Sequence, residues 1–558
     1  MQISLTSRIN KLILGSIYAA QELKSLPNVP IDDFTVERPQ NASHGDFATG
    51  IAMKLAKPMR MAPLAIATEI RRNLKTDELI EAIELVTPGF INIFISKNWL
   101  TNQLEEILMN PDTFGNSNIG MGEKLQIEYI SVNPTGKLHI GHARGAIIGS
   151  ALANMLKAAN YKVHQEYYLN DAGSQIDKLN QSVFSRYQQL MGKNTPMPED
   201  SYPGDDVIKV ANKIKLKVDS QIGGESDADI LQLSKELSVQ YMIDLINEDV
   251  KDLRIEFDNW FSEKSLLDNG EFEACIAQLR SLDLVEEKEG ALWLKSTKIG
   301  EEKDNVLIRS SGIPTYFATD IAYHFNKFQK RGFDRVIDVW GADHQGQVPR
   351  LKSAVKALGI DSEKLHMILV QMVRFKSGET SEKLSKREGN IIPLEDLIKE
   401  IGADACRFVF LSRSHEAQLE FDMDLVKSQS SDNPVYYVQY AHARICSILR
   451  LSRDKNITYT EADLKLLQHQ SEISLIHKLF QFPDILETIA RNYEPHHMTH
   501  YSLELATAFH TFYQQCRVIS DKPSDIDLTK ARLKLADATR VILNRALTLM
   551  SMSAPEKM

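Results

Sequence analysis

The chain has 558 residues, which is too long for one hydrophobic core and predicts three or four domains of about 100–200 residues each. Apolar residues make up 43% of the sequence, and no run reaches the roughly 20 apolar residues that a membrane span needs, so we expect a soluble protein. The net charge of −10 excludes a uniformly basic nucleic-acid coat but is compatible with RNA binding by a local basic stripe.

The four cysteines, at positions 275, 406, 446 and 516, are too scattered for a disulfide framework or for zinc-ligand spacing. A reducing cytoplasm is therefore the expected location. The first 26 residues carry Arg8 and Lys11 on apolar helical periodicity and faintly resemble a mitochondrial presequence. Acidic residues and further periodicity follow directly, so we favour a first domain helix.

Taken in chain order, the pattern changes three times. Residues 1–115 alternate helical runs with short strands such as Phe90–Ile95, which predicts an α+β N-terminal domain. Residues 116–380 read as an α/β Rossmann-type domain, with predicted parallel strands at Leu125–Ile130, Lys162–Leu169, Arg335–Trp340 and His366–Val370. A charged helical insertion interrupts this domain at about 180–250. Residues 381–430 connect to an all-α domain at 431–558, with helices expected at 433–453, 461–480, 499–518 and 528–550.

One short motif stands between the first predicted strand of the sheet and the helix that follows it, His139-Ile-Gly-His142. Gly136 and Gly141 would let a nucleotide approach the backbone. The helix start and the two imidazoles would face developing phosphate charge. The alternative is a structural loop with surface histidines, but the strand-loop-helix context favours a phosphate site.

A second basic motif lies far downstream, Lys383-Leu-Ser-Lys-Arg387. Lys383 and Lys386, with Ser385 between them, could neutralise the β- and γ-phosphates as pyrophosphate leaves. Taken alone, this segment is better interpreted as a basic surface turn. Together with the first motif, it favours adenylate chemistry.

The two motifs resemble the HIGH and KMSKS signatures of class I aminoacyl-tRNA synthetases, although Leu384 and Arg387 depart from the second consensus. The surrounding segments are similar to the arginyl-tRNA synthetase family along nearly the whole chain. The segments that carry this likeness are Glu37–Pro39, His44–Ala48, Glu128–Arg144, Tyr167–Gly173, Tyr202–Asp205, Phe257–Ser262, Tyr316–Ala322 and Gly341–His344. The resemblance implies ATP, arginine and tRNA(Arg) as substrates, Mg²⁺ accompanying ATP, no protein-bound zinc or other protein metal site, and a monomer.

A guanidinium pocket needs buried carboxylates together with hydroxyl or carbonyl acceptors. The sequence offers Glu128 on the first strand of the sheet and, on consecutive turns of a predicted helix, Tyr316 and Asp320. A capping or strand-end role is the alternative for each carboxylate. By resemblance, the arginine site would comprise Glu128, Tyr316 and Asp320 around the side chain, Ser131 and Asn133 around the α-amino and carboxylate groups, and Gln175 closing the pocket.

The segment Gly341-Ala-Asp343-His344 follows a predicted strand and falls where nucleotides bind in open α/β sheets. We assign it to the ATP adenosine, with Gln347 and Val373 as weaker candidates from the resemblance. A tight turn with exposed polar residues is the alternative.

Two segments are candidate tRNA surfaces. Tyr437, Tyr440, Ala441 and Arg444 share one helix face, which could stack bases and bind phosphate. Their spacing alone favours core positions, but residues 433–444 resemble the anticodon-binding helix of the family. By the same resemblance, Tyr513 and Met558 join that surface, while Phe90 would stack on the tRNA elbow and Asn92 would hydrogen-bond a D-loop base. A plain β-strand is the alternative for the last two residues.

The resemblance implies two steps, formation of arginyl-adenylate and transfer of arginine to the 2′-hydroxyl of tRNA. Charge stabilisation by His139, His142, Lys383 and Lys386 would carry the first step. In this family, activation usually awaits bound tRNA, and we expect the same here. The rivals are another enzyme with a HIGH signature and a catalytically silent, synthetase-like RNA-binding protein.

Overall fold

The computed structural model describes residues 4–39, 41–75, 77–199, 201–202, 204–220, 226–376 and 392–558. The chain divides into two compact units. We call the unit of Met121–Lys157 and Tyr161–Ser428 the sheet unit. The helical unit comprises Met1–Gly120, Ala158–Asn160 and Gln429–Met558.

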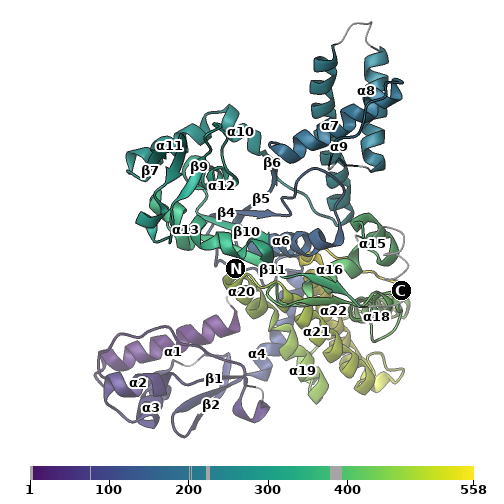
Figure 1. The fold of residues 1–558 in the computed structure, drawn as a ribbon. Coiled ribbons are helices and arrows are strands. Elements are labelled where there is room, and N and C mark those ends of the chain that lie inside the picture. Colours follow the sequence, from purple (N-terminus) through teal and green to yellow (C-terminus); the bar gives the residue numbers. More distant parts are fainter. Residues whose placement is uncertain are drawn as a thin grey trace. The chain divides into compact units, whose positions relative to one another are not determined.

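The sheet unit is built on a five-stranded parallel sheet in the order β11-β10-β4-β5-β6 (Figure 1). The strands are β4 (Lys124–Tyr129), β5 (Lys162–Leu169), β6 (Asn259–Ser262), β10 (Arg335–Gly341) and β11 (Leu365–Val370). The chain runs from β4 through α6 (Ile140–Ala158) to β5, whereas β10 pairs with the opposite edge of β4. The connections therefore diverge at β4, which is where ligands bind in open α/β sheets. The predicted α/β parallel-sheet fold is confirmed.

The two faces of this sheet carry different side chains. Helix α6 covers the face of Tyr129, whose ring lies against Gly149 of that helix. The other face carries buried acids, and it is covered by α12 (Tyr316–Phe325) and the π-helical turn η3 (Asn326–Lys330). Contact with this second face is direct, because the Tyr323 hydroxyl donates to Glu166 Oε1 at 2.6 Å.

The close approach of α6 to β4 depends on Gly149. A Cβ atom there would lie 2.3 Å from Tyr129 Cγ, and Tyr129 is fully buried. We expect Gly149→Ala to lower the free energy of unfolding by about 1–3 kcal/mol, because overpacking forces the ring or the helix to move. Gly145→Ala on the same helix is the control, since its Cβ would meet Val339 Cγ1 at an ordinary 3.8 Å. Urea unfolding of both variants measures the effect, and equal stabilities would contradict this packing account.

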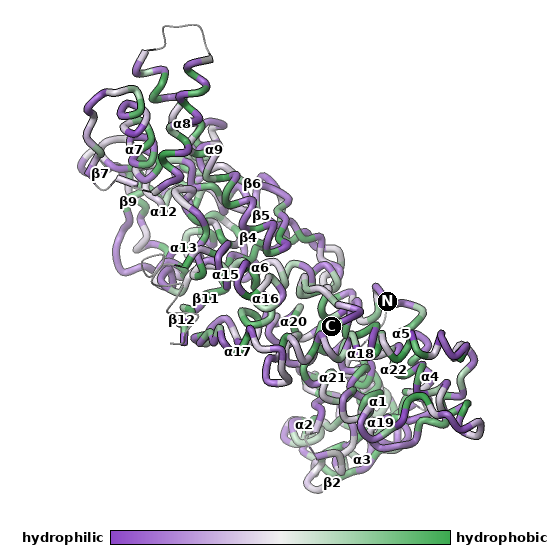
Figure 2. The backbone as a smooth tube through the Cα atoms, turned by 90° about the vertical axis from the view of Figure 1, so that its right-hand side faces the viewer, coloured by the Kyte–Doolittle hydropathy of each residue, from purple (hydrophilic) through white to green (hydrophobic). Residues whose placement is uncertain are grey.

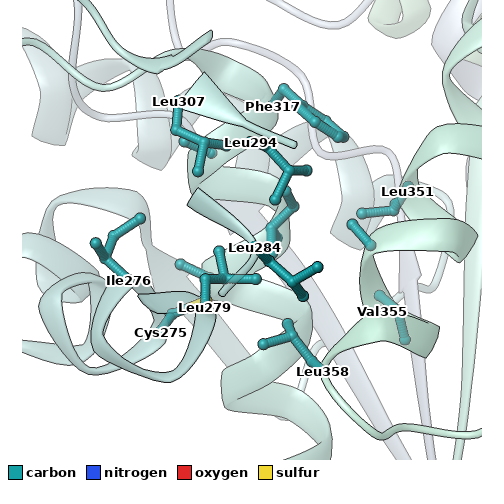
Figure 3. Close-up of a cluster of buried hydrophobic side chains, with 14 of the residues drawn as sticks. Cys275, Ile276, Leu279, Leu284, Leu294, Leu307, Phe317, Leu351, Val355 and Leu358 are labelled. Carbon is teal, nitrogen blue, oxygen red and sulfur yellow. The ribbon is translucent and has the colours of Figure 1, made fainter. Parts of the chain in front are cut away.

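A second sheet, antiparallel in the order β7-β8-β9, supports α12 from its outer side. Its strands are β7 (Val285–Lys288), β8 (Ala291–Leu294) and β9 (Asn305–Ile308), with α10 (Glu263–Asp268), α11 (Glu271–Ser281) and α13 (Val348–Ala357) nearby. Leu279, Leu294, Phe317 and Leu351 belong to the core among these elements (Figure 3). Phe317 and Ile321 place the apolar face of α12 in this core, which also includes Val336 and Leu365 of the parallel sheet, while Tyr323 contacts the sheet through Glu166.

The helical insertion consists of α7 (Ser174–Leu190), α8 (Asp205–Ser220) and α9 (Asp227–Asp252), which lie side by side (Figure 1). Leu179, Val210 and Met242 belong to its own core. A capping box of Ser226 and Asp229 begins α9. The insertion was predicted at about 180–250, and helices occupy much of 174–252.

The rest of the sheet unit follows the parallel sheet in the chain. β12 (Val373–Phe375) pairs in parallel with β13 (Leu419–Phe421). The remaining elements are η2 (Ser296–Ile299), η4 (Ala342–Gln347), η5 (Ser362–Lys364), α15 (Leu394–Ile401), α16 (Ala403–Leu411) and α17 (Met423–Lys427).

The helical unit contains both ends of the chain. Its N-terminal part has a small antiparallel sheet, β1-β3-β2, made of β1 (Phe47–Thr49), β2 (Ile80–Val86) and β3 (Phe90–Ile95). With it lie η1 (Ala42–His44), α1 (Leu5–Glu22), α2 (Ile51–Met59), α3 (Pro63–Asn73), α4 (Lys97–Asn102) and α5 (Leu104–Met109). The Thr6 amide and the Arg38 guanidinium both bind the Asp484 carboxylate, so α1 is joined to the C-terminal helices.

Those C-terminal helices are α18 (Pro434–Asp454), α19 (Gln470–Leu479), α20 (Phe482–Asn492), α21 (His496–Gln515) and α22 (Ile526–Leu549), with the short turns η6 (Leu464–Leu466) and η7 (Pro523–Asp525). The prediction of helix over 461–480 is wrong for its first half, because a capping box of His469 and Glu472 begins α19 only at Gln470. Helix α20 was not predicted. The other three predicted helices are confirmed to within a few residues.

No helix in the described part of the chain is long and apolar enough to cross a membrane. Hydrophilic and hydrophobic residues alternate along the long helices instead, as the tube colours show for α9 and α22 (Figure 2).

Candidate active site

The loop after β4 leaves the sheet through two unusual backbone conformations. Ile130 has φ of 72° and Ser131 has φ of 34°, which non-glycine residues seldom adopt and which cluster at functional sites. Strand β5 holds this loop, because the Tyr168 amide donates to Ser131 Oγ at 3.1 Å and the Tyr167 hydroxyl donates to Val132 O at 2.9 Å. The carboxyl end of β4 is therefore fixed where the predicted arginine site begins.

The two histidines of the HIGH segment stack on each other, with ring centroids 3.6 Å apart. The Gly141 amide donates to His139 Nδ1 at 3.1 Å, and the His139 amide donates to His142 Nδ1 at 3.3 Å. Both Nδ1 atoms accept, so in each neutral ring the proton sits on Nε2. A Cβ at Gly141 would lie 3.0 Å from His139 Cε1, so a side chain there would require the His139 ring to shift.

Burial lowers the pKa of both imidazoles, and burial together with the neighbouring His139 lowers the pKa of His142 to about 4. In the free protein at neutral pH the pair therefore presents two Nε2–H donors rather than two cations. This changes the character of the predicted electrostatic clamp. Its attraction for phosphate oxygen comes from oriented N–H dipoles and the start of α6.

The HIGH segment is anchored by three contacts. They were not predicted from the sequence. Asp249 of the insertion helix α9 accepts from the Leu138 amide at 3.0 Å, and burial raises the pKa of Asp249 to about 6. The Ile140 amide donates to Ile392 O at 3.1 Å, and Lys137 pairs with Glu395 at 2.8 Å. The segment that immediately precedes α15 is thus bound to the HIGH segment.

Arg144, two residues after the HIGH tetrapeptide, provides a fourth anchor. It is fully buried on α6 and donates to the carbonyls of Gln371, Ser414 and Ala417 at 2.8–2.9 Å. A buried guanidinium with carbonyl acceptors on two chain segments fixes those segments to α6. Only its position beside the HIGH residues could have pointed to this role.

The predicted adenosine segment follows β10 directly. A Cβ at Gly341 would lie 2.4 Å from Asp343 Oδ1, so a side chain there would require the exposed Asp343 carboxylate to move. Asp343 and Gln347 both approach the exposed His344 ring, at 3.5 Å and 3.3 Å. Val373 begins β12, and Gly136 lies in the loop before α6. The second basic motif, with Lys383, Ser385 and Lys386, lies outside the described residues.

The predicted arginine residues come from three elements near the carboxyl end of β4. Asn133 Nδ2 donates to Gln175 Oε1 of α7 at 2.7 Å. The exposed Tyr316 begins α12, and its hydroxyl lies 3.7 Å from the position of a Cβ on Gly173, just before α7. Asp320 lies one turn further along α12, and burial raises its pKa to about 7. The charge of Glu128 contributes to the raised pKa of Asp320.

The carboxylate oxygens of Glu128 and Asp320 accept few hydrogen bonds. Glu128 is buried, and its Oε2 pairs with Lys327 Nζ at 2.6 Å. In the described part of the chain, no group donates to Glu128 Oε1 or to the Asp320 carboxylate. A planar cation with several donors would satisfy these remaining oxygens.

Three family models match the chain. They are the arginyl tRNA synthetase N terminal domain at residues 13–95, the class I (R) tRNA synthetase catalytic domain at 103–420 and the DALR anticodon binding domain at 438–558. An arginine–tRNA ligase of Dehalococcoides mccartyi is 46% identical over 99% of both chains, and one of Heliobacterium modesticaldum is 43% identical over 99% of this chain and 98% of its own. The chain belongs to the arginyl-tRNA synthetase family.

The fold agrees with this membership. The Thermus thermophilus arginyl-tRNA synthetase structure superposes with a TM-score of 0.74, covering 97% of this chain and 99% of its own at 22% identity, which is a likeness of fold alone. The predictions of the family, the class I fold and the enzyme class, an arginine–tRNA ligase, are confirmed. The roles of individual residues are not tested by these likenesses.

The predicted anticodon-binding residues lie in the part of the chain that matches the DALR domain. Arg444 of α18 has its Cζ atom 5.0 Å from the ring centroid of Tyr440 and 5.1 Å from that of Tyr513. His510, which the sequence did not single out, packs on Tyr437 and Tyr440. Ala441 is fully buried beneath this aromatic cluster.

Met558, assigned to the same surface, and the second candidate tRNA surface, Phe90 with Asn92, also belong to the helical unit. The C-terminal tail is held on α18 by bonds such as Gln439 Nε2 to Ser553 O, at 3.0 Å, and Met558 is 53% exposed. On β3, Phe90 is 41% exposed, whereas Asn92 is buried at 4%. Of those two residues, only Phe90 presents its side chain to solvent.

Proposed function

We propose that the protein joins arginine to tRNA(Arg) in two steps at the carboxyl end of β4, with ATP as the energy source and Mg²⁺ entering with it as part of that substrate. In the first step, an arginine carboxylate oxygen attacks the α-phosphorus of ATP, giving arginyl-adenylate and pyrophosphate. In the second, the 2′-oxygen of the terminal ribose attacks the activated carbonyl and AMP leaves. Positioning and charge stabilisation carry both steps, without a covalent enzyme intermediate.

The observation that carries this proposal is the pair of partly satisfied carboxylates beside the HIGH segment. No group in the described part of the chain donates a hydrogen bond to the Asp320 carboxylate, and burial raises its pKa to about 7. Binding of a cation would therefore stabilise the ionised form. Glu128 offers a further free oxygen. A guanidinium could bind both carboxylates, and a neutral side chain would leave buried charge unpaired.

The remaining predicted residues take the following roles in the proposal. Tyr316 bounds the arginine side chain, while Ser131, Asn133 and Gln175 surround its α-amino and carboxylate groups. The Nε2–H groups of His139 and His142 donate to phosphate oxygens. The adenosine lies at Gly341, Asp343 and His344, with Gly136, Gly141 and Val373 close to it. Lys383, Ser385 and Lys386 bind the leaving pyrophosphate, a role that rests on the resemblance.

We place tRNA on the helical unit. Residues 431–558 would bind the anticodon loop through Tyr437, Tyr440, Arg444 and Tyr513, a surface that combines stacking rings with a cation. Ala441 would shape that surface from below, and Met558 would border it. Residues 1–115 would contact the tRNA elbow through Phe90, with Asn92 beside it. Residues 116–380 form the catalytic domain in this proposal, and 381–430 the second signature and the stem contact.

We also propose that the protein is a monomer and that it works in a reducing cytoplasm. All four cysteines are buried and free, which supports a reducing compartment.

ATP–pyrophosphate exchange with each of the twenty amino acids, with and without tRNA(Arg), tests the reaction. We expect exchange with arginine alone, and only when tRNA is present. Exchange with a different amino acid, or none with tRNA(Arg), would overturn the proposal. Exchange with arginine in the absence of tRNA would overturn only the requirement for tRNA.

A further inference from the structure

Three buried acids form a row across the parallel sheet. Asp338 of β10 is in register with Glu128 of β4, and Glu128 is in register with Glu166 of β5. Residues in register on neighbouring parallel strands point to the same face, so the three carboxylates lie side by side. Like charges in such positions destabilise a sheet unless other groups neutralise them.

The segment from α12 to η3 supplies the neutralising groups. Lys327 Nζ, which is fully buried, binds Glu128 Oε2 at 2.6 Å and Asp338 Oδ1 at 2.8 Å. The same ammonium lies 4.1 Å from the centroid of the Tyr323 ring. Arg331 Nη1 binds Glu166 Oε1 at 2.7 Å. Lys327 lies in the π-helical turn, a feature that is frequent at functional sites.

His324 connects this row to Asp320. Its Nε2 lies 2.7 Å from Asp338 Oδ2, and its Nδ1 lies 2.7 Å from the backbone carbonyl of Asp320. A carbonyl only accepts, so Nδ1 of His324 is the donor to the Asp320 carbonyl. One network thus joins Glu128 to the turn of α12 that carries Asp320.

The charges of this network do not cancel. Glu166 and Arg331 balance each other. Glu128 and Asp338 share Lys327, and the charges of Glu128 and of the buried Glu263 both act on Asp320, so carboxylates outnumber the lysine ammonium here. The free oxygens are those of Glu128 Oε1 and Asp320, at the proposed arginine site.

We propose that Lys327 is a specificity-determining positioning residue, which by binding Glu128 and Asp338 makes the arginine pocket selective for a cationic guanidinium over a neutral side chain. This inference rests on the proposed arginine site. Lys327 does not touch the substrate in this arrangement. It occupies one oxygen of Glu128, directs the other to the pocket, and keeps the buried carboxylate ionised.

The directions of the pKa shifts agree with this role. Burial raises the pKa of Glu128, and the charge and hydrogen bond of Lys327 offset part of that rise. Asp338 and His324 also act on Glu128, the former raising and the latter lowering its pKa. Without the lysine charge, Glu128 would hold its proton to higher pH, and guanidinium binding would require that proton to leave.

Lys327→Gln and Lys327→Arg separate charge from hydrogen bonding. The KM for arginine is measured by exchange between pH 6 and 9, at saturating ATP and tRNA. For K327Q, which keeps a donor but loses the charge, we expect KM to rise about tenfold or more at pH 7 and its pH dependence to move alkaline by about one unit or more. We expect K327R to keep the wild-type pH profile.

Specificity provides a second readout. Citrulline replaces the guanidinium by a neutral ureido group of similar shape. The ratio of its inhibition constant to the KM of arginine should be several-fold smaller in K327Q than in the wild type, because a protonated Glu128 no longer demands a cation.

Lys534→Gln is the matched control, since Lys534 is also buried and ion-paired, with Glu105, and both residues belong to the helical unit, whereas this pocket belongs to the sheet unit. It should lower stability without moving the pH profile. A wild-type profile in K327Q, or an alkaline profile in K327R, would overturn the inference and reduce Lys327 to a structural role. If K327Q does not fold, the K327R profile decides. Failure of the wild-type enzyme to use arginine would instead overturn the proposed function.

Discussion

Replacing Asp320 by asparagine is expected to reduce kcat/KM for arginine by about 100-fold to 1000-fold in ATP–pyrophosphate exchange. The carboxylate is partly buried on α12 and has no described donor, so its charge is available to the substrate. A guanidinium that loses one of its two carboxylate partners is left inadequately paired, at a cost of about 3–4 kcal/mol. The KM for ATP should change little.

The affinity for arginine is also expected to depend on pH through Asp320. Burial raises the pKa of Asp320 to about 7, so below that pH the proton competes with the guanidinium for the carboxylate. Arginine affinity should therefore rise with pH, by up to about tenfold per unit, and level off above about pH 7. D320N should lose this dependence. Asp283→Asn, an exposed carboxylate paired with Lys295 and Lys298, is the control and should behave as the wild type. Unchanged arginine kinetics in D320N would place the guanidinium elsewhere.

Replacing His142 by alanine should lower kcat for exchange by about 100-fold to 1000-fold, the usual cost of removing an oriented donor to transition-state charge. Because His142 Nδ1 accepts from the His139 amide, the proton on Nε2 is the one offered to phosphate. His142→Gln can place an amide N–H near the same position, so we expect it to recover about tenfold or more of the loss. Single-turnover kinetics with and without saturating ATP separates kcat from binding.

His366→Gln controls for the removal of a histidine as such. Burial lowers the pKa of His366 to about 4, as it does for His142, but His366 pairs in register with Ile337 near the beginning of its strand, remote from the strand's carboxyl end. Wild-type rates are expected for H366Q. Equal losses in H142Q and H142A would show that the Nε2 donor is not what the reaction uses.

Periodicity was sufficient for the elements whose burial pattern is simple. The strands Phe90–Ile95 and Lys162–Leu169 were predicted with their observed bounds, because each is a run of apolar and aromatic residues between turn signals. The antiparallel strands β7 to β9 were not predicted. They have only four residues each, and β7 exposes Glu286 and Glu287, so no alternating run is long enough to recognise. The start of α19 depends on a histidine cap, which sequence rules for caps do not anticipate.

In the candidate active site, too, some residues could be predicted from the sequence and others could not. Residues beside a motif, such as Ser131 and His142, could be located from the sequence because strand, loop and helix follow one another. Lys327 could not, since its role depends on the register that sets Asp338 beside Glu128 across more than 200 residues of chain. The spacing of Asp320, Tyr323, His324 and Lys327 is helical, but spacing alone does not reveal that the facing strands carry acids.

The row of acids also constrains how the protein folds. β4 and β5 come early in the chain, and pairing them sets Glu128 beside Glu166 before the segment that carries Lys327 and Arg331 has been made. At neutral pH the central strands therefore cannot reach their full stability as an isolated sheet. Docking of α12 and η3 is the event that makes the sheet stable, so strands and helix should appear together as one cooperative folding unit during refolding.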